Sequence, residues 1–566
     1  MAYDRDLEAF IYDDSTAALV LKSENLYLLG NSEVRLGKTL SGGEIVVYVK
    51  EEDIPRFVNY AGNYVLGVYP LTMGLMGERE LGAAGILPLQ NQPALNLRGS
   101  GVLLGFVDTG IDFTMDAFRW EDGSSRVAAI WDQSIPGAPP ESFLYGTEYT
   151  REQINEALNT QNPFEKVPHR DTVGHGTFLA SVAASRERDE YAGAAPDAEI
   201  IVVKLRRACP FARRRFLVPE TQENVFAGDD LMLGVQYILE KALALGRPAA
   251  ICCGIGTNLG SHDGFQTAEE YLAEVSGIAG MLICCAAGNE SGAGHHTNGR
   301  IGQTGGTADI ELRAAVAGED IYISIFNSAA DRLSVSVRSP GNEEINRVPA
   351  QSGISYERKL IMERSTVMID YMFPIVGSGG QFTRVKILDA AQGIWRITVH
   401  GDYILDGLFH ARLPITGFIN PGTVFLSAMP NYTIVTPATS LGVICCGAYD
   451  SRDNSLSPTT SWGPSQLPSV LPDLVAPGVD VAGLFPGNMR GVMSGTSVAA
   501  AITAGAGALF LEWGIVQGNN PSLNTYTISA NLLSGNDRDP GVTYPSLQWG
   551  FGRLDLLNTF RFLRPL

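Results

Sequence analysis

A long run of small residues near the carboxyl end constrains the fold of this chain more than any other feature. Residues 499–508 are alanine, glycine, threonine and isoleucine, and a Leu-Phe-Leu sequence follows at 509–511. Alanine-rich apolar sequence of this length predicts a helix buried against other structure. Ser497 stands at its first turn, where backbone N–H groups lack helical acceptors and can bind negative charge. Ser497 is therefore either the N-cap of a core helix or a nucleophile.

The composition limits the classes of partner. The chain has 566 residues, of which 45% are hydrophobic, and this leaves room for several domains. Its net charge of −20 argues against nucleic acid or an anionic membrane as the main partner. The first residues lack a basic stretch followed by an apolar core, and no uncharged apolar run reaches transmembrane length. We therefore expect no membrane span and synthesis in the cytoplasm without a signal peptide.

The cysteines support a reducing compartment. Apart from Cys209, they form three adjacent pairs at 252–253, 284–285 and 445–446, each inside an apolar, strand-like run. Neighbouring residues of a strand point to opposite faces. The pairs are thus expected to be small buried hydrophobic residues, neither a disulfide framework nor a metal site.

The order of predicted elements divides the chain. A strand at 45–49, a helix at 53–60 and a strand at 64–69 predict a small β-α-β unit, which is either a propeptide or a decorative subdomain. From residue 101 onward, buried strands alternate with helices, which predicts a doubly wound parallel sheet. Between residues 300 and 433, short alternating strands such as 321–325, 333–337 and 395–399 predict an inserted β-sandwich or jelly roll. The α/β pattern then resumes at 441–447.

Three polar residues combine with Ser497. Asp108 ends an apolar strand, His175 lies between two glycines, and Asn289 follows the apolar run 281–287. Each alone has a structural explanation, such as a loop cap or a core histidine. Nucleophilic serine catalysis needs a base, an acid that orients it, and donors for the developing oxyanion. Together the four residues meet that need.

These motifs resemble those of the subtilisin-like serine proteases. The matching segments are Asp-Thr-Gly at 108–110, Gly-His-Gly-Thr at 174–177, Ala-Gly-Asn at 287–289, Gly-Thr-Ser at 495–497, and residues 472–478 and 550–555. The resemblance covers roughly residues 100–300 and 435–560. It implies that Ser497 is the nucleophile, His175 the general base and acid, and Asp108 the orienting carboxylate. It also implies that Asn289 and the backbone N–H of Ser497 form the oxyanion hole.

The resemblance further assigns a substrate-binding segment. Gly254, Ile255 and Gly256 lie where the family forms a wall of its specificity pocket and pairs with extended substrate. Gly254 replaces the serine that is usual there. Residues 498–501, Val-Ala-Ala-Ala, replace the usual Met-Ala-Ser-Pro. These changes leave the catalytic atoms in place and affect the pocket wall and the local helix geometry.

A narrower similarity is to the Csp proteases of clostridia, carried by the N-terminal unit, the insert, residues 257–264 and residues 497–501. These germination proteases reside in spores and activate a cortex-lytic pro-enzyme by limited cleavage. Their prodomain is cut autocatalytically but stays bound, and a jelly-roll insert locks the structure. The similarity implies a prodomain at 1–77, a catalytic domain at 78–300 and 434–566, and an insert at 301–433. It also implies a spore-associated enzyme whose partners are its own prodomain and a cortex hydrolase pro-enzyme.

Two alternatives remain open at this stage. Besides the germination protease, one alternative is a Csp-like subtilase with another intracellular role. The other is an inactive signalling scaffold of the kind that the same group contains. The presence of Asp108, His175 and Ser497 favours an active enzyme.

Weaker signals lie outside these motifs. Residues 206–215 carry five arginines, which form either a solvated loop or a docking site for an acidic substrate segment. His295 and His296 follow a glycine-rich stretch, and we expect a flexible loop there because no paired carboxylates or thiolates stand at ligand spacing. Calcium is common in the protease class that the sequence resembles, but no Asp-x-Asp loop identifies a site here, so calcium stays open and no other cofactor is assigned.

Overall fold

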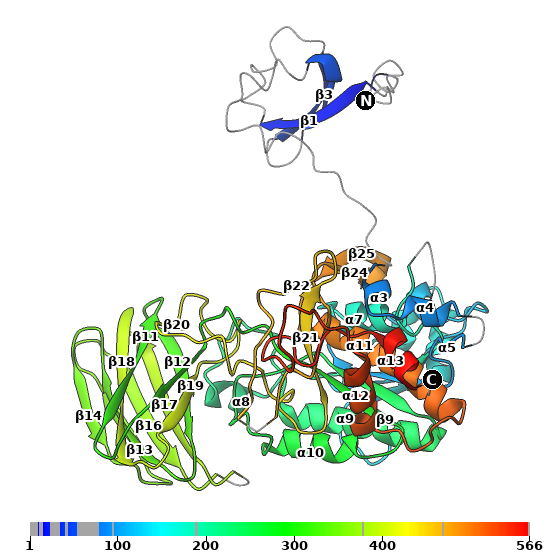
Figure 1. The fold of residues 1–566 in the computed structure, drawn as a ribbon. Helices are drawn as coiled ribbons and strands as arrows, with labels where there is room; N and C mark the ends of the chain where they lie inside the picture. Colours follow the sequence, from blue (N-terminus) through cyan, green and yellow to red (C-terminus); the bar gives the residue numbers. More distant parts are fainter. Residues whose placement is uncertain are drawn as a thin grey trace. The chain divides into compact units, whose positions relative to one another are not determined.

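The structure is a computed structural model, and it describes residue 10 and residues 15–22, 34–39, 44–53, 79–92, 95–186, 191–375, 378–466 and 469–563. The chain divides into two compact units, Met1–Leu75 and Met76–Leu566 (Figure 1). Each unit is considered by itself.

The described part of the first unit is a three-stranded antiparallel sheet. Its strands are β1 (Thr16–Lys22), β2 (Val34–Thr39) and β3 (Glu44–Lys50), in the order β1-β3-β2, followed by a short 3-10 turn, η2 (Glu51–Asp53). The strand expected at 45–49 is thus present as β3, whereas β1 and β2 lie in a region where the sequence pattern indicated no element. The helix expected at 53–60 and the strand at 64–69 fall almost entirely outside the described residues.

The second unit is built on a nine-stranded, mostly parallel sheet. Strand order is β22-β21-β9-β8-β4-β7-β5-β6, and β23 also pairs with β21. Only β6 and β22 run antiparallel to their neighbours. The strands are β4 (Leu103–Asp108), β5 (Val127–Asp132), β6 (Thr147–Thr150), β7 (Glu199–Lys204), β8 (Ala249–Cys253), β9 (Met281–Ala286), β21 (Ile444–Asp450), β22 (Ser455–Leu456) and β23 (Leu474–Pro477).

Helices cover both faces of this sheet, because successive strand residues point to opposite sides. In β4, Leu104 and Phe106 pack into the core that contains α7 and α11, whereas Leu103 and Val107 pack into the core that contains α9 and α10. The helices are α3 (Arg79–Ala83), α4 (Leu87–Gln90), α5 (Arg151–Leu158), α6 (Pro163–Lys166), α7 (His175–Ala184), α8 (Pro210–Arg215), α9 (Gly228–Leu245), α10 (Thr267–Ser276), α11 (Thr496–Leu511), α12 (Thr525–Gly535) and α13 (Leu556–Leu563). The doubly wound parallel sheet predicted from the sequence is therefore confirmed.

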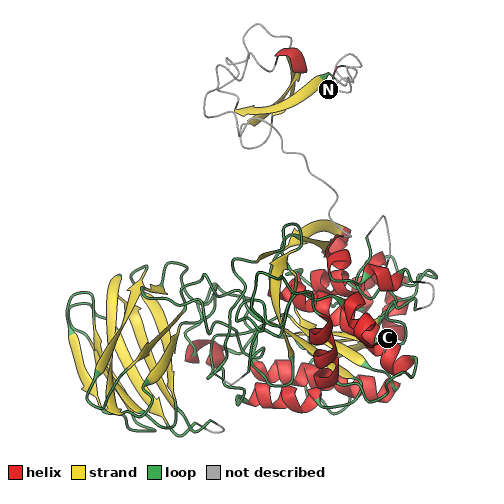
Figure 2. Ribbon diagram, in the orientation of Figure 1, coloured by secondary structure: helices red, strands yellow, loops and turns green. Residues whose placement is uncertain are grey.

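The inserted region is made of strands and loops (Figure 2). A six-stranded sheet, β10-β19-β12-β17-β16-β15, and a five-stranded sheet, β14-β13-β18-β11-β20, share one hydrophobic core. The strands are β10 (His296–Arg300), β11 (Thr307–Ala314), β12 (Glu319–Asn327), β13 (Arg332–Arg338), β14 (Glu344–Val348), β15 (Ser355–Lys359), β16 (Thr366–Met372), β17 (Gln381–Ala390), β18 (Gly393–Tyr403), β19 (Leu408–Arg412) and β20 (Val424–Phe425). Two antiparallel sheets around one core form a β-sandwich, whose jelly-roll connectivity stays a prediction. The first sheet begins at β10, before residue 301.

Helix α11 is a buried helix that packs on the parallel sheet of the second unit. All of its residues are buried, and it packs against α7 and the strands β8, β9 and β21. Among the described residues, the segment Thr496–Val516 alone is long and apolar enough to cross a membrane, with a mean hydropathy of 1.6, and 89% of an 18-residue stretch within it is buried inside the protein. Such burial is that of a core helix.

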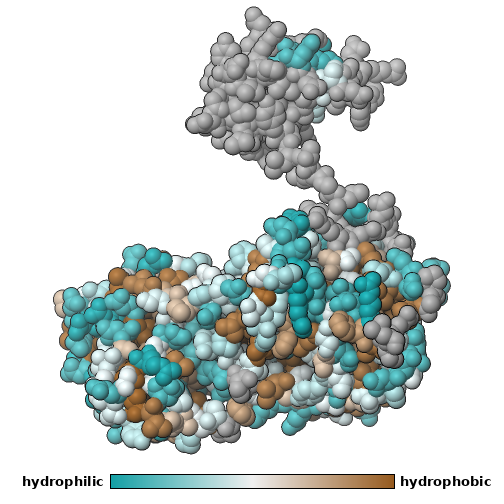
Figure 3. Space-filling model, viewed as in Figure 1, coloured by the Kyte–Doolittle hydropathy of each residue, from teal (hydrophilic) through white to brown (hydrophobic). Residues whose placement is uncertain are grey.

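On the face drawn in Figure 3, apolar residues are interspersed with polar ones.

The cysteine pairs lie on three adjacent strands of this sheet. Cys252 pairs with Cys284 and Cys253 with Cys285 across β8 and β9, and Cys445 of β21 pairs with Cys285. These are neighbours across strands and not disulfides: all six cysteines are buried, as the sequence predicted, and have free thiols. Cys209 is exposed. Burial raises the pKa of the Cys252 thiol. These residues therefore act as packing groups below the carboxyl ends of the strands.

Candidate active site

Asp108 and His175 form a hydrogen-bonded pair at the carboxyl edge of the parallel sheet. Asp108 is the last residue of β4 and His175 the first residue of α7, and His175 Nδ1 lies 2.7 Å from Asp108 Oδ1. The Asp108 side chain is 1% exposed and that of His175 is 26% exposed. Asp108 Oδ1 also accepts a hydrogen bond from the Thr109 backbone N–H (2.7 Å). The carboxylate is thus held in one orientation against the imidazole.

The electrostatic surroundings favour the protonated imidazole. Burial lowers the pKa of His175, but the charge and hydrogen bond of Asp108, together with the charge of Asp171, outweigh burial and raise it above its ordinary value. A carboxylate placed in this way stabilises the imidazolium that forms when a base takes up a proton.

Ser497 lies at the amino-terminal turn of α11 and is 8% exposed. Its hydroxyl donates a hydrogen bond to the Gly254 carbonyl oxygen (2.7 Å). Gly254 also adjoins the imidazole, since a Cβ at this position would lie 3.2 Å from His175 Cε1. The serine, histidine and aspartate predicted from separate motifs therefore meet around Gly254. Because a hydroxyl has one proton, Ser497 must exchange its bond to Gly254 for one to His175 Nε2 before the proton can be transferred.

Asn289 is exposed and lies three residues beyond β9. Its Oδ1 accepts a hydrogen bond from the Thr496 backbone N–H (3.1 Å), while Thr496 Oγ1 accepts one from the Gly288 N–H (3.0 Å). The amide oxygen thus has a donor, and Nδ2 is the amide atom that can itself donate; it lies beside Gly495, since a Cβ there would be 3.3 Å from it. The Ser497 backbone N–H belongs to the helix start, where no helical acceptor exists. Two donors are therefore available for one oxyanion.

The segment expected to bind substrate directly follows β8. Gly254 is half-buried and accepts the Ser497 hydroxyl, and a side chain at Gly256 would approach Val435 Cγ2 to 2.4 Å. Thr257 continues the segment by exchanging backbone hydrogen bonds with Thr436 (2.8 and 3.0 Å). The segment from Gly254 to Thr257 is thus anchored at its far end.

Sequence reasoning missed several supporting residues. Asp171 caps α7: Oδ1 accepts from the Gly174 N–H (2.8 Å) and Oδ2 from the Thr177 N–H (2.9 Å). It stands four residues before His175, and this spacing could have suggested a cap. A second buried aspartate–histidine pair, Asp132 and His169, lies behind the turn that follows Asp108. No local pattern marks that pair, because its members are 37 residues apart.

The expectation of a flexible loop at His295 and His296 is wrong. Both residues are 3% exposed; His296 begins β10, and His295 Nδ1 lies 2.8 Å from Glu290 Oε2. The sequence could not show this because β10 pairs with β19, more than one hundred residues away. Within the described part of the chain, no group of three or more His, Cys, Asp or Glu side chains gathers as metal ligands do.

The arginine-rich stretch forms the short helix α8 and its flanks. Arg206 binds Asp230 (2.9 Å) and stacks over the Tyr145 ring, and Arg207 and Arg213 donate to backbone carbonyls of the following loop. Arg214 is exposed. Much of the positive charge is therefore engaged within the protein.

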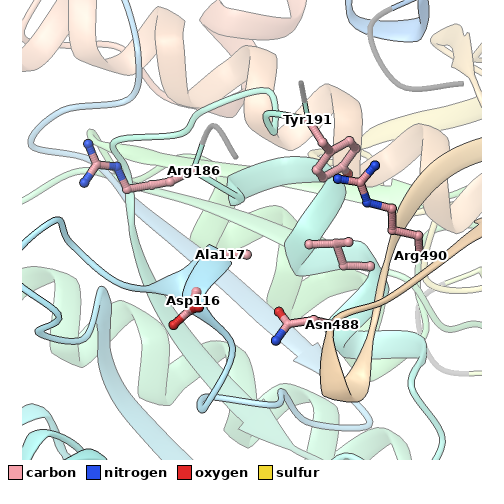
Figure 4. Close-up of a pocket in the computed structure, with 7 residues that line it drawn as sticks. Asp116, Ala117, Arg186, Tyr191, Asn488 and Arg490 are labelled. Carbon is pink, nitrogen blue, oxygen red and sulfur yellow. The ribbon is translucent and has the colours of Figure 1, made fainter. Parts of the chain in front are cut away.

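A cavity of about 240 Å³ lies apart from these residues. It is lined by the 3-10 turn η4 (Asp116–Phe118), by Arg186 and Tyr191, and by the hairpin of β24 (Val481–Phe485) and β25 (Met489–Met493), including Arg490 (Figure 4). Neither Asp108, His175 nor Ser497 lines it.

Proteases are among the known proteins that this chain resembles. The model of the subtilase family matches residues 99–348 and 417–552. The subtilase-type proteinase RRT12 of Saccharomyces cerevisiae is 30% identical over 110 residues, which are 18% of this chain and 21% of that protein. The serine protease AprX of Bacillus subtilis is 31% identical over 140 residues, 20% of this chain and 30% of AprX. The chain thus aligns with less than a third of each of these two relatives.

A solved structure resembles the chain over a much longer span. The Clostridium perfringens CspB protease superposes with a TM-score of 0.75 and 30% sequence identity, and the match covers 86% of this chain and 98% of that one.

Proposed function

Because this chain belongs to the subtilase family, close to the Csp proteases, we propose that Ser497, His175 and Asp108 make it an active serine endopeptidase. The observation that carries the proposal is the convergence of the three residues at the carboxyl edge of the sheet. His175 and Asp108 are hydrogen-bonded, and Gly254 accepts a hydrogen bond from the Ser497 hydroxyl and adjoins the imidazole.

The chemistry follows from these positions. The Ser497 hydroxyl turns from Gly254 to His175 Nε2 and attacks the carbonyl carbon of the scissile peptide, while His175 takes its proton. Asp108 stabilises the imidazolium. Asn289 Nδ2 and the Ser497 backbone N–H donate to the oxyanion of the tetrahedral intermediate. His175 then protonates the leaving amine, and a water molecule activated by His175 hydrolyses the acyl-enzyme.

The segment from Gly254 to Thr257 supplies the substrate-binding part of the proposal. Gly254, Ile255 and Gly256 follow a buried strand, and the two glycines carry no side chain, so an extended peptide can lie against the backbone groups of this segment. Small residues at both ends of the segment permit close approach of substrate to Ser497.

We also propose that the enzyme processes itself. The boundary between the two compact units falls between Leu75 and Met76 in the sequence, near the expected end of the prodomain at residue 77. Similarity to the CspB protease over 86% of the chain supports autocatalytic cleavage in this region, with the prodomain staying bound. The same similarity supports spore residence and a cortex hydrolase pro-enzyme as the substrate.

The wild type and Ser497→Ala, weighed as intact proteins, test self-processing. We expect a cut near residues 70–80 in the wild type only. Mixing purified wild type with full-length Ser497→Ala then shows whether the cut can occur between molecules. Identical full-length masses of both proteins, before and after mixing, would contradict self-processing.

A second experiment tests the substrate. Spore cortex and coat extracts are incubated with wild type or Ser497→Ala, and new protein termini are mapped by mass spectrometry. The proposal expects a single dominant cut in a cortex hydrolase pro-enzyme, made by the wild type alone. Cuts scattered over many proteins would contradict limited proteolysis.

A further inference from the structure

His169 and Asp132 form a second aspartate–histidine pair that lies wholly inside the protein. Both side chains are 0% exposed, and His169 Nδ1 lies 2.7 Å from Asp132 Oδ2. Asp132 Oδ1 accepts hydrogen bonds from the backbone N–H (2.9 Å) and the hydroxyl (2.5 Å) of Ser134, and Lys204 Nζ lies 3.9 Å from Oδ2. Burial raises the pKa of Asp132, but the hydrogen bond and charge of His169 outweigh it, so the net shift is downward. Asp132 is therefore an ionised acceptor, and His169 Nδ1 carries the proton.

The other ring nitrogen of His169 faces the turn that follows Asp108. His169 Nε2 accepts a hydrogen bond from the Ile111 backbone N–H (3.2 Å). This nitrogen must be unprotonated, since an N–H cannot accept from another N–H. Asp132 and Ile111 thus select one neutral tautomer of His169.

The ring also fits closely against Gly110. This glycine has φ = 115°, and a Cβ on it would lie 3.0 Å from His169 Cε1. The turn from Asp108 to Ile111 is therefore hydrogen-bonded to the imidazole, and Gly110 leaves too little space for a side chain between them.

The same turn sets the geometry of the catalytic pair. Thr109 Oγ1 accepts from the Gly176 N–H (2.9 Å), and the Thr109 N–H donates to Asp108 Oδ1, the oxygen that binds His175. A Cβ on Gly176 would lie 2.3 Å from the Gly110 carbonyl oxygen, so the turn and the start of α7 touch. A shift of the turn would consequently move Asp108 relative to His175.

We propose that His169, held by Asp132 in its Nδ1-protonated form, is a positioning residue that holds the Asp108 turn and thereby the Asp108–His175 contact. This inference rests on the proposed protease function. His169 touches neither substrate nor the reacting atoms; it acts through Asp108.

Three near-isosteric variants separate positioning from general packing. In His169→Asn, the amide reaches the place of Nδ1 and can bind Asp132, but nothing accepts from the Ile111 N–H. In His169→Gln, the amide oxygen reaches the place of Nε2 and keeps that acceptor, while the contact to Asp132 is lost. In Asp132→Asn, the two Ser134 donors hold the amide oxygen, so its NH2 faces His169 Nδ1. The imidazole must then carry its proton on Nε2, where it opposes the Ile111 N–H.

The assay uses the full-length chain and a quenched fluorescent peptide that the wild type cleaves. We expect His169→Asn and Asp132→Asn to lower kcat on the order of 10- to 100-fold with KM unchanged, because a small misplacement of a catalytic group has an effect of this size. His169→Gln should keep most of the wild-type kcat.

The pH dependence of kcat/KM distinguishes positioning from a purely structural role, because loss of stability alone would not shift the pKa of His175. The groups that face His175 are Asp108 and Asp171, and both raise its pKa. If Asp108 moves away, the pKa of His175 falls, so the acid limb of kcat/KM shifts to lower pH in His169→Asn and Asp132→Asn but not in His169→Gln. Thermal unfolding, followed by circular dichroism, identifies variants that are folded at the assay temperature.

The outcomes separate this inference from the proposed function. A wild type that neither cleaves peptides nor reacts with a fluorophosphonate overturns both. If the wild type is active, either of two results overturns the inference alone. One is that kcat and the acid limb are unchanged in His169→Asn and Asp132→Asn. The other is that kcat of His169→Gln falls as far as kcat of those two variants. If His169→Asn does not fold, Asp132→Asn against His169→Gln decides in the same way.

Discussion

Gly254 offers a sharp test of the packing around the reacting groups. A Cβ on this residue would lie 2.6 Å from Leu179 Cδ1, 3.0 Å from Asp108 Oδ2 and 3.2 Å from His175 Cε1. Leu179 is 1% exposed on α7, so its methyl group has little room to move. Gly254→Ala therefore forces a side chain into the space shared by the nucleophile's acceptor and the catalytic pair.

The magnitude follows from the shortest contact. Carbon atoms in contact normally lie about 3.5–4.0 Å apart, so roughly 1 Å must be gained against Leu179. Overpacking of this kind costs about 1–3 kcal/mol. Because the displaced neighbours include Asp108 and His175, we expect kcat to fall by about 10- to 100-fold as well.

A double-mutant cycle isolates the clash. Leu179→Val removes the δ carbons and by itself should lower the unfolding free energy by about 1 kcal/mol. In the double variant the clash with the new Cβ is relieved, so we expect a coupling energy of about 1–2 kcal/mol in favour of the folded state. Unfolding free energies are measured by urea denaturation in a Ser497→Ala background, which prevents self-digestion, and kcat is measured with Ser497 intact. Gly228→Ala is the matched control, because no atom lies within 4 Å of a Cβ at the start of α9. The reasoning is refuted if Gly254→Ala behaves like Gly228→Ala, or if Leu179→Val gives no rescue.

Three further predictions concern the site and the pH dependence of the protein. His175 must be neutral to accept a proton, and its pKa is raised. A pH profile of kcat/KM should therefore show an acid limb above the ordinary histidine pKa, and this limb should move to lower pH in Asp108→Asn. Asn289→Ala removes one oxyanion donor, and steady-state kinetics should show kcat lower by about 10²–10³-fold with little change in KM; an equal rise in KM would contradict a role confined to the transition state. Burial raises the pKa of Asp473 to about 7, against a smaller opposing effect of the Cys445 backbone N–H. Between about pH 4 and about pH 7, the folded state therefore holds a proton on Asp473 that the unfolded chain has released. Urea titrations at each pH should show the unfolding free energy falling over this range, and less steeply in Asp473→Asn.

The sequence predicted those parts of the site that are encoded locally. Asp108, His175, Asn289 and Ser497 each lie at or within three residues of the end of an element whose apolar pattern is clear, and each lies beside glycines or small residues. Parallel strands bring their carboxyl ends to one edge, so placing the residues on the elements also placed them near one another.

What the sequence did not predict depends on pairing between distant segments. The burial of His296 comes from β10 joining β19, and the His169–Asp132 contact joins the end of β5 to the segment before α7. The strand β2 was missed because it contains a glycine and a lysine and its register with β3 is irregular. Similarly, the bond from Ser497 to the Gly254 carbonyl depends on a backbone group, which no residue type reveals.

The central claim is that Ser497 is a nucleophile activated by His175. The most direct measurement is covalent labelling of the purified full-length protein with a fluorophosphonate, followed by peptide mapping. The account predicts one phosphonate per molecule on Ser497 in the wild type, a rate reduced by orders of magnitude in His175→Ala, and no label in Ser497→Ala. Labelling of another serine, or equal labelling of the wild type and His175→Ala, would contradict it.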